Sequence, residues 1–200
     1  EFAFKGGISL PEGAQSDFIF SHADEKKIPL GFTVRCNYFD IHYYPGSAMP
    51  KDYLSGLTVI EDGKDILTTT IEVNKPLVYK GITFYQSSYK QIGAAIIKLR
   101  ETGSGTVYAF PVNPKNYSLT YQWQEGGTDA MLLIRETRLL YGPDEKVTGM
   151  EMDIWMMDSD GPPSMFSLKY GESVIVERPE AKYELSIGPH FATGLQVAKD

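Results

Sequence analysis

Few side chains in this sequence could do chemistry, and they are scattered. Cys36 is the only cysteine, and His22, His42 and His190 are the only histidines. A single cysteine excludes an internal disulfide and any metal site built on paired cysteines. A thiol can act in redox chemistry and a histidine can ligate haem iron. Cys36 and His190 are therefore the thiol and haem candidates, and His190 is favoured because it follows Gly188-Pro189 near the end of the chain.

Each candidate also has a simpler structural interpretation. Cys36 alternates with Phe32 and Val34, so it is expected on the apolar face of a strand as a small buried hydrophobe. His42 lies out of phase with its apolar neighbours and is expected to face solvent or an opposing sheet. These structural readings are favoured over haem or thiol chemistry.

The carboxylates do not form a catalytic pattern. Asp62, Asp65, Asp158 and Asp160 stand close to glycines and are typical of turns, and no pair has a spacing that requires acid–base catalysis. The run 158–161 resembles the start of a calcium loop but lacks its downstream glutamate, so no metal site is predicted. Known motifs for phosphate, dinucleotide, zinc-protease or serine-hydrolase chemistry are absent from the sequence. We therefore expect a protein that is not an enzyme.

Charge and composition narrow the class further. The chain of 200 residues has 19 basic and 26 acidic side chains, a net charge of −7, and no run of lysine or arginine. Nucleic-acid binding requires a basic surface, so nucleic acid is excluded as a partner, and an anionic membrane surface is disfavoured. No apolar run approaches the ~20 residues that span a bilayer.

The elements that must position these residues are strands. Alternation marks 32–36 and then shifts phase at Phe39, which predicts a β-bulge. Asp62-Gly63 between two β-branched runs predicts a hairpin. Short strands are expected at 82–89, 94–100 and 182–187, among others, with turns between them. The predicted fold is all-β with little helix: an antiparallel sandwich, or paired sheets with a barrel-like arrangement.

One domain is expected over residues 1–200. The Thr-Gly-Ser-Gly run near 102–106 is the best candidate for a boundary between two lobes. The same run fits a hairpin turn, and we favour that interpretation.

The segment 73–89 is the most distinctive. It reads Val-Asn-Lys-Pro-Leu-Val-Tyr-Lys-Gly-Ile-Thr-Phe-Tyr-Gln-Ser-Ser-Tyr. Pro76 lacks an N–H and disfavours helix before it, and Gly81 is expected to turn the chain with a positive φ. Phe84, Gln86 and Ser88 should then share one face of a strand. The pattern predicts a strand, a corner and a second strand.

This segment resembles the signature of the ResB-like family. The family pattern is also matched by residues 31–36 with Phe39, by Tyr-Pro-Gly at 44–46, by 50–55, and by 57–59. At the far end, residues 191–200 resemble the family segment that leads into the last transmembrane helix. The middle, from about 91 to 189, carries little of the pattern.

The resemblance implies an extracytoplasmic, periplasmic domain of a multi-pass membrane protein that works in system II maturation of c-type cytochromes. The expected partners are a ResC-like membrane protein, which handles haem, and apocytochrome c. Both ends of the chain are then expected to be membrane junctions. Haem is expected in the full complex rather than on this domain, and the role would be assembly without catalysis.

A set of candidate binding residues follows from the resemblance. Those expected to bind a partner are Asn74, Pro76, Leu77, Tyr79, Gly81, Phe84, Tyr85, Gln86 and Tyr89. Their structural alternative is a corner in which Asn74 caps a turn and Gln86 satisfies buried backbone groups. The alternative function is a stand-alone β-sandwich that binds a small ligand such as haem or a sugar, which the 12% aromatic content suggests.

Overall fold

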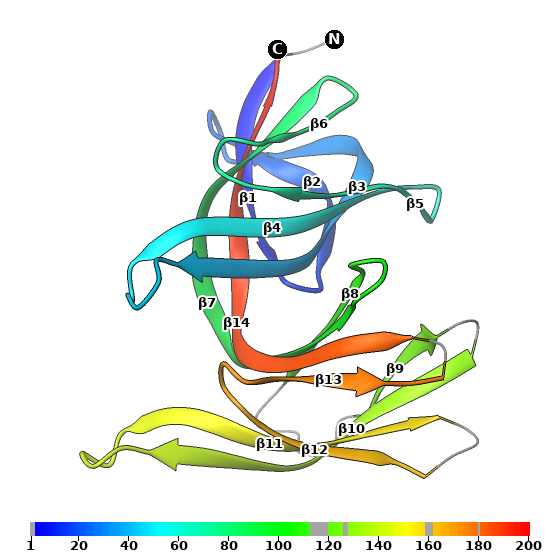
Figure 1. Cartoon of the computed structure of the whole chain (residues 1–200). Helices are drawn as coiled ribbons and strands as arrows, with labels where there is room; N and C mark the ends of the chain where they lie inside the picture. The colour runs from blue at the N-terminus through cyan, green and yellow to red at the C-terminus, as the bar shows by residue number, and fades with distance from the viewer. Residues whose placement is uncertain (1–2, 113–119, 126–127, 159–161, 180) are drawn as a thin grey trace. The chain divides into compact units, whose positions relative to one another are not determined.

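The computed structural model describes residues 3–112, 120–125, 128–158, 162–179 and 181–200. These residues form strands and connecting turns, and no helix in them is long and apolar enough to cross a bilayer. The strands are β1 (Phe4–Pro11), β2 (Gln15–Ser21), β3 (Lys27–Tyr43), β4 (Pro50–Glu61), β5 (Lys64–Ile71), β6 (Leu77–Tyr79), β7 (Ile82–Glu101), β8 (Val107–Val112), β9 (Thr120–Glu125), β10 (Thr128–Tyr141), β11 (Val147–Asp158), β12 (Ser164–Lys169), β13 (Ser173–Glu177) and β14 (Lys182–Lys199) (Figure 1). The all-β prediction is confirmed.

The chain divides into two compact units. Unit 1 contains residues 1–92 and 191–200, and unit 2 contains residues 93–190. Strands β7 and β14 each contribute to both units, because each continues past the residue at which the units divide. The run near 102–106 coincides with neither of these division points. That run is the turn that joins β7 to β8 within unit 2, as the hairpin interpretation predicted.

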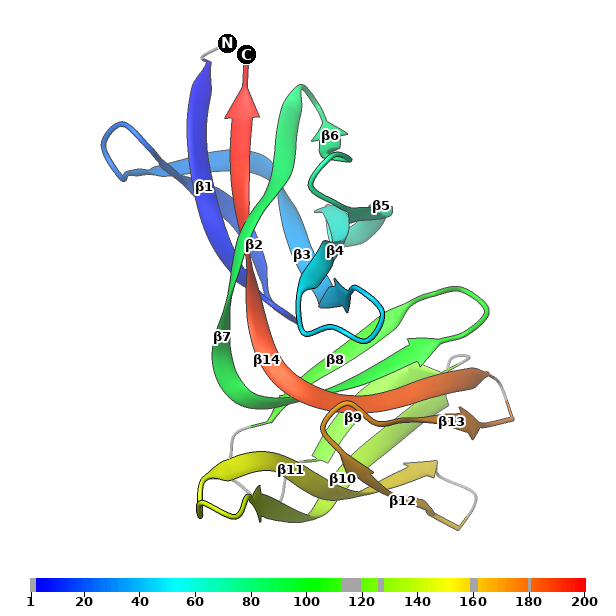
Figure 2. The same ribbon diagram turned by 60° about the vertical axis from the view of Figure 1, so that its left-hand side comes forward.

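Unit 1 is built on a single rolled sheet. Its hydrogen-bonded order is β5-β4-β3-β2-β1-β14-β7-β6, and each pairing with a described register is antiparallel. The first and last strands of the chain are neighbours, with Phe4 opposite Lys199 and Pro11 opposite Ala192 (Figure 2). The inward side chains form one apolar core, which includes Leu10, Ile19, Phe32, Val34, Cys36, Leu57, Val59, Leu77, Phe84 and Leu195.

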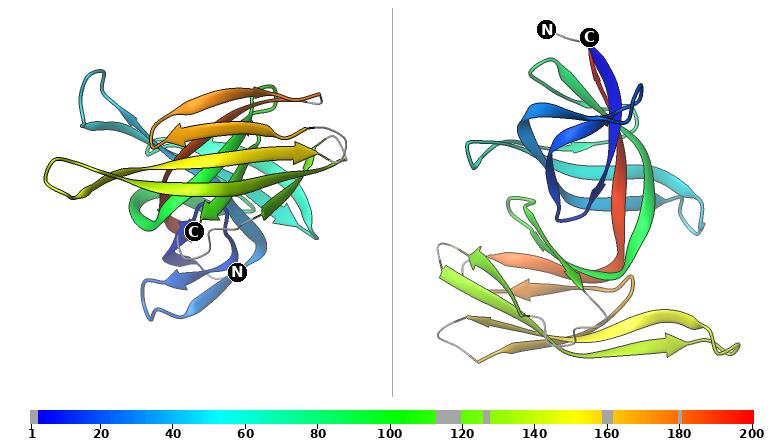
Figure 3. Two further views of the ribbon diagram at one scale, coloured as in Figure 1. Left: turned by 90° about the horizontal axis from the view of Figure 1, so that it is seen from below. Right: turned by 180° about the vertical axis from the view of Figure 1, so that it is seen from behind.

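Unit 2 is a sandwich of two antiparallel layers. One layer holds β8, β13 and the unit 2 parts of β7 and β14, and the other has the order β12-β11-β10-β9 (Figure 3). Residues from both layers pack in one core. Met150, Met152 and Met156 are buried there, as their alternation along the sequence predicts, and each fully buried side chain contributes ~2 kcal/mol.

Local turn chemistry explains several connections. Asp62 and Gly63 have φ of 52° and 72°, and they close the β4–β5 hairpin with the two positive φ angles of a type I′ turn. The register of β3 against β4 shifts between Cys36 and Tyr38, which confirms the predicted β-bulge. Both features are local, and a short stretch of sequence specifies each of them.

The long strands differ from the prediction. The separate strands predicted at 82–89 and 94–100 form one strand, β7, and the strand predicted at 182–187 continues to Lys199 in β14. Residues 90–93, Lys-Gln-Ile-Gly, do not continue the alternation of polar and apolar side chains, so the sequence predicts a break between two strands there. Backbone pairing does not depend on that alternation, because every residue type supplies the same N–H and C=O groups.

Candidate functional site

The segment 73–89 forms the end of the unit 1 sheet, and three of its nine candidate residues are buried. Leu77 and Phe84 are buried in the core, and Gln86 is 6% exposed. The Gln86 side chain bonds the Ser55 and Thr193 hydroxyls, and its Nε2 donates to the Ser88 carbonyl oxygen at 3.1 Å. The Ser55 and Thr193 hydroxyl oxygens lie 2.8 Å apart. This amide therefore joins β4, β7 and β14 inside the sheet.

Lys80 and Gly81 turn the chain from β6 into β7. Their φ angles are 48° and 76°, so Gly81 adopts the positive φ expected from the sequence. The turn brings the Tyr79 hydroxyl to Glu61, to whose Oε2 it donates at 2.9 Å, while Lys80 pairs with Oε1 of the same carboxylate. Lys80 holds the pKa of Glu61 below its ordinary value, and desolvation together with Glu61 raises the pKa of Tyr79. Glu61 thereby links the end of β4 to the β6–β7 turn, across the two ends of the rolled sheet.

The remaining candidates are at the surface. Asn74 is exposed in the turn that Glu72 and Lys75 close with two backbone hydrogen bonds, and Pro76 and Tyr85 are also exposed. Among the described residues, the Asn74 side chain neither accepts nor donates a hydrogen bond, so the described contacts give no support to a capping role. These three side chains are available to a partner.

Tyr89 takes a different position from the one its alternation predicts. Its ring centroid lies 5.1 Å from that of buried Phe39, 5.0 Å from that of Tyr53 and 5.8 Å from that of Phe191. Ser88 is exposed, although it was expected to share the inward face of Phe84 and Gln86. The alternation therefore changes phase between Gln86 and Tyr89.

A buried carboxylate supports this aromatic cluster. Glu12 is 1% exposed, and its two oxygens accept the backbone N–H groups of Phe39 and Phe191, each at 3.0 Å. A carboxylate that accepts backbone N–H groups makes stronger hydrogen bonds than a neutral acceptor. Glu12 therefore fixes the backbone under two rings of the cluster.

An open groove of about 600 Å³ crosses the surface of unit 1 beside this segment. Strands β1, β2, β7 and β14 line it, together with the turn after β2. The lining residues are Gly7, Ile8, Ser9, Phe20, Ser21, His22, Glu25, Ser88, Tyr89, Lys90, Ala192, Gly194, Leu195 and Gln196. Thus Ser88 and Tyr89 at the end of the distinctive segment, together with the next residue, Lys90, form part of a surface groove rather than only a core.

Small residues keep part of the groove open. Gly7 lies opposite Gln196, and Ser9 lies opposite Gly194. A Cβ added at Gly7 would lie 3.1 Å from the Leu195 carbonyl oxygen, and one at Gly194 would collide with the Ser88 hydroxyl. Glycines within strands often mark a close approach of another backbone. Here the close neighbours are the Leu195 carbonyl at Gly7 and the Ser88 side chain at Gly194, so the two glycines permit close packing along the groove.

The thiol and haem candidates belong to different units, Cys36 to unit 1 and His190 to unit 2. Cys36 is fully buried, and its Sγ lies 3.5 Å from the Tyr38 carbonyl oxygen, as expected of a small core residue. His190 is half-buried in β14 of unit 2, where a Cβ added at Gly93 would lie 3.2 Å from its ring. His42 is exposed and is not among the groove residues.

The described residues contain no group of three or more His, Cys, Asp or Glu side chains placed to hold a metal ion. The calcium-loop resemblance falls on residues 158–161, of which 159–161 lie outside the described residues.

Sequence reasoning did not identify several residues of this site. Glu12, Ser55 and Thr193 are buried polar residues whose partners are distant in sequence, so no local pattern marks them. Gly7 and Gly194 had a usable signal, because glycine within a strand-like stretch indicates a bulge or a close backbone approach.

Comparison with known proteins places the chain in a family. The sequence profile of the ResB-like family matches residues 1–200. The chain belongs to the ResB-like family. It is 36% identical over 91 residues to cytochrome c biogenesis protein Ccs1 of Heterosigma akashiwo, a match that covers 45% of this chain and 20% of that protein.

Two further relatives extend this result. Cytochrome c biogenesis protein Ccs1 of Pyropia yezoensis is 24% identical over 191 residues, which cover 91% of the chain and 38% of the relative. Protein NrfI of Wolinella succinogenes is 35% identical over 65 residues, which cover 32% of the chain and 7% of the relative. This ResB-like chain therefore matches well under half the length of each of these relatives.

Proposed function

We propose that this ResB-like chain is a non-catalytic assembly module for c-type cytochrome maturation, and that it holds an extended segment of apocytochrome c in the groove of unit 1. In the full-length protein it would stand on the extracytoplasmic, periplasmic face of the membrane, anchored by membrane spans and next to a ResC-like partner that handles haem. The family match and the names of the relatives support the cytochrome c pathway.

The observation that carries the binding role is the position of residues 88–90. The distinctive segment of the family resemblance leaves the core there and lines the groove with Ser88, Tyr89 and Lys90. Gly7 and Gly194 line the same groove and contribute no side chain to it. An extended peptide can lie against such a surface with its main chain close to the strands and its alternate side chains in the groove.

Asn74, Pro76 and Tyr85 belong to the same proposal as exposed residues of that segment. In contrast, Leu77, Tyr79, Gly81, Phe84 and Gln86 would act indirectly, since their contacts build the sheet that presents the groove. A substitution at these five residues should therefore change stability before it changes binding.

The test is an amide NMR titration of the chain with a peptide that carries a Cys-x-x-Cys-His motif, under reducing conditions. We expect the largest shifts at Gly7, Ser88 and Gly194, and a weaker affinity in the His22→Ala variant. His42→Ala is the matched control, because His42 is exposed but does not line the groove.

Two outcomes would remove the basis of the proposal. One is the absence of shifts around the groove at millimolar peptide. The other is an equal response to a peptide in which both cysteines and the histidine are replaced by serine and alanine, because that result would indicate unselective adsorption.

A further inference from the structure

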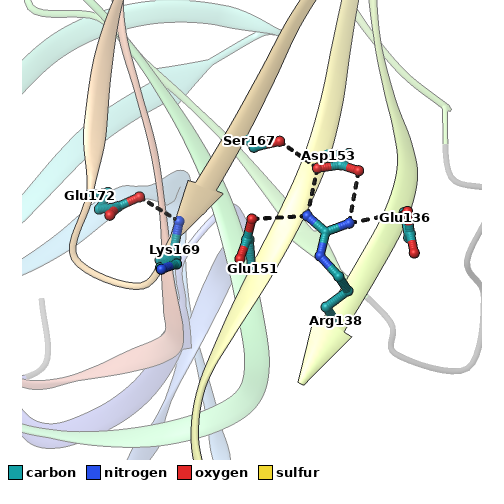
Figure 4. A network of polar contacts seen from close by, with 7 residues as sticks. All are labelled: Glu136, Arg138, Glu151, Asp153, Ser167, Lys169 and Glu172. Atoms are coloured by element: carbon teal, nitrogen blue, oxygen red, sulfur yellow. Dashed lines mark hydrogen bonds and ion pairs between the residues drawn. The ribbon is translucent and has the colours of Figure 1, made fainter. Parts of the chain in front are cut away.

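A network of ion pairs crosses the outer face of β10, β11 and β12 in unit 2 (Figure 4). The Arg138 guanidinium donates to both oxygens of Asp153, at 2.9 Å and 2.8 Å, and to Glu151 at 3.0 Å. It also pairs with Glu136 at 3.1 Å, and the Ser167 hydroxyl donates to Asp153. Arg138 holds the pKa of Asp153 below its ordinary value. This network fixes three neighbouring strands relative to one another.

A groove of about 390 Å³ adjoins the network. The Arg135 guanidinium lies over the Trp155 ring, 4.8 Å from its centroid, and the Met165 side chain beside them is 65% exposed. Arg135 is the extra residue of a β-bulge in β10, since the register shifts between Ile134 and Glu136. Tryptophan and arginine dominate the binding energy of protein interfaces, and methionine adapts to varied apolar partners. The lining residues are Arg135, Glu136, Asp153, Trp155, Met165, Phe166 and Ser167.

The groove runs along an edge strand. Within the described residues β12 pairs only with β11, and it is the last strand of the order β12-β11-β10-β9. The Tyr170 N–H donates to the Met150 carbonyl of β11, whereas the Lys169 N–H donates to the Glu172 carboxylate. Backbone groups of an antiparallel strand alternate between its two sides, so the N–H and C=O groups of Met165 and Ser167 point to the outer edge.

Natural proteins normally protect such an edge with lysine, proline or a covering segment. The only lysine of β12 is Lys169, its last residue, and Pro162 and Pro163 directly precede the strand, so residues 164–168, Ser-Met-Phe-Ser-Leu, form a stretch of edge that contains neither residue type. An edge of this kind favours the addition of another strand.

Charge selects the partner. The charged side chains of the network, the groove and the end of β12 are Arg135, Arg138 and Lys169 with Glu136, Glu151, Asp153 and Glu172, which sum to +3 and −4, or −1. The chain as a whole has a net charge of −7. A segment with basic residues is therefore attracted to this face, whereas an acidic one is repelled.

We propose that the outer edge of β12 binds an extended segment of a partner protein that alternates basic and apolar residues, and that this segment adds a strand to the sheet and places an apolar side chain against Trp155 and Met165. This surface is separate from the groove of unit 1, so the proposal does not depend on the one above.

The test is a titration of the chain with a short peptide of alternating lysine and valine, followed through the indole N–H signal of Trp155, which the Trp155→Phe variant assigns. We expect that signal to shift, together with the amides of Met165 and Ser167. A peptide of alternating glutamate and valine of equal length should bind at least about tenfold more weakly.

Two changes probe the backbone pairing. Ser167→Pro removes an outward N–H but leaves the backbone hydrogen bonds between β12 and β11 in place, and it should weaken peptide binding about tenfold or more. Ser167→Ala keeps that N–H and should bind the peptide more tightly than the proline variant. If the proline variant does not fold, the unmodified chain is titrated instead with a lysine–valine peptide whose backbone nitrogens are methylated. This peptide should bind as weakly as the proline variant was expected to bind the unmodified peptide. Equal affinity for the lysine and glutamate peptides would overturn the proposal, as would unchanged binding of the methylated peptide. His22→Ala should not affect this titration.

Discussion

The buried amide of Gln86 gives the sharpest test of how the distinctive segment works. Gln86→Ala removes the bonds to the Ser55 and Thr193 hydroxyls and to the Ser88 carbonyl. Each such hydrogen bond contributes ~1 kcal/mol net. Ser55 and Thr193 keep their mutual contact at 2.8 Å, which limits the penalty for unpaired hydroxyl groups. We therefore expect the free energy of unfolding to fall by about 3 kcal/mol.

This loss corresponds to a decrease in Tm of roughly 6–12 °C for a chain of this size. Urea unfolding should be followed by far-UV circular dichroism and by tryptophan fluorescence in parallel. Both tryptophans, Trp123 and Trp155, lie in unit 2, while Gln86 lies in unit 1. If the units unfold separately, only the circular dichroism transition will move; if they unfold together, both will move equally.

Gln86→Leu and Ser87→Ala are the controls. Leucine keeps most of the volume and should cost about half as much as alanine, whereas the exposed Ser87 should change stability by less than ~0.5 kcal/mol. A Gln86→Ala variant as stable as Ser87→Ala would refute the structural reading of this amide and return Gln86 to the list of direct binding residues.

Three further predictions concern other parts of the chain. Arg138 lowers the pKa of Asp153 in the folded state, so Asp153 stabilises the fold above its unfolded pKa of about 3.9, and this stabilisation is lost as the pH falls below that value. The free energy of unfolding of Asp153→Asn should therefore decline less in acid than that of the unmodified chain. Urea unfolding at several pH values measures the difference. Gly194→Ala should destabilise by ~1–3 kcal/mol through collision with Ser88, and Ser88→Ala in the same chain should restore part of that loss in thermal unfolding. Gly81→Ala should cost ~1 kcal/mol because of the positive φ, and a wild-type Tm would contradict this.

Local features were predictable from sequence because neighbouring residues determine them. The positive φ at Gly63 and Gly81 and the bulge after Cys36 follow from turn chemistry and from a change in alternation. The hydrogen-bond partners of Gln86 were not predictable: Ser55 is 31 residues away and Thr193 is 107 residues away. Only the paired sheet brings such residues together, and alternation does not encode strand order.

The candidate site was predicted in outline only. The segment at 73–89 was identified, but the sequence did not separate its buried residues from its exposed ones at Ser88 and Tyr89, where the alternation changes phase. The methionines show how a residue type alone leaves the face of a strand undetermined. Met150 and Met152 do pack in the core, but Met165 on neighbouring β12 is exposed, since strand faces alternate and only one of them meets the opposing layer.

The pairing of β1 with β14 has a mechanical consequence. The two strands are antiparallel, and Phe4 at the start of one lies opposite Lys199 at the end of the other. A pulling force applied to the two ends of the chain would thus break the backbone hydrogen bonds between β1 and β14 one after another. A force in the shear geometry would instead load all of these hydrogen bonds at once. Peeling should begin at the outermost pair and proceed toward Pro11, so β1 should separate from β14 at a lower force than a shear geometry would require.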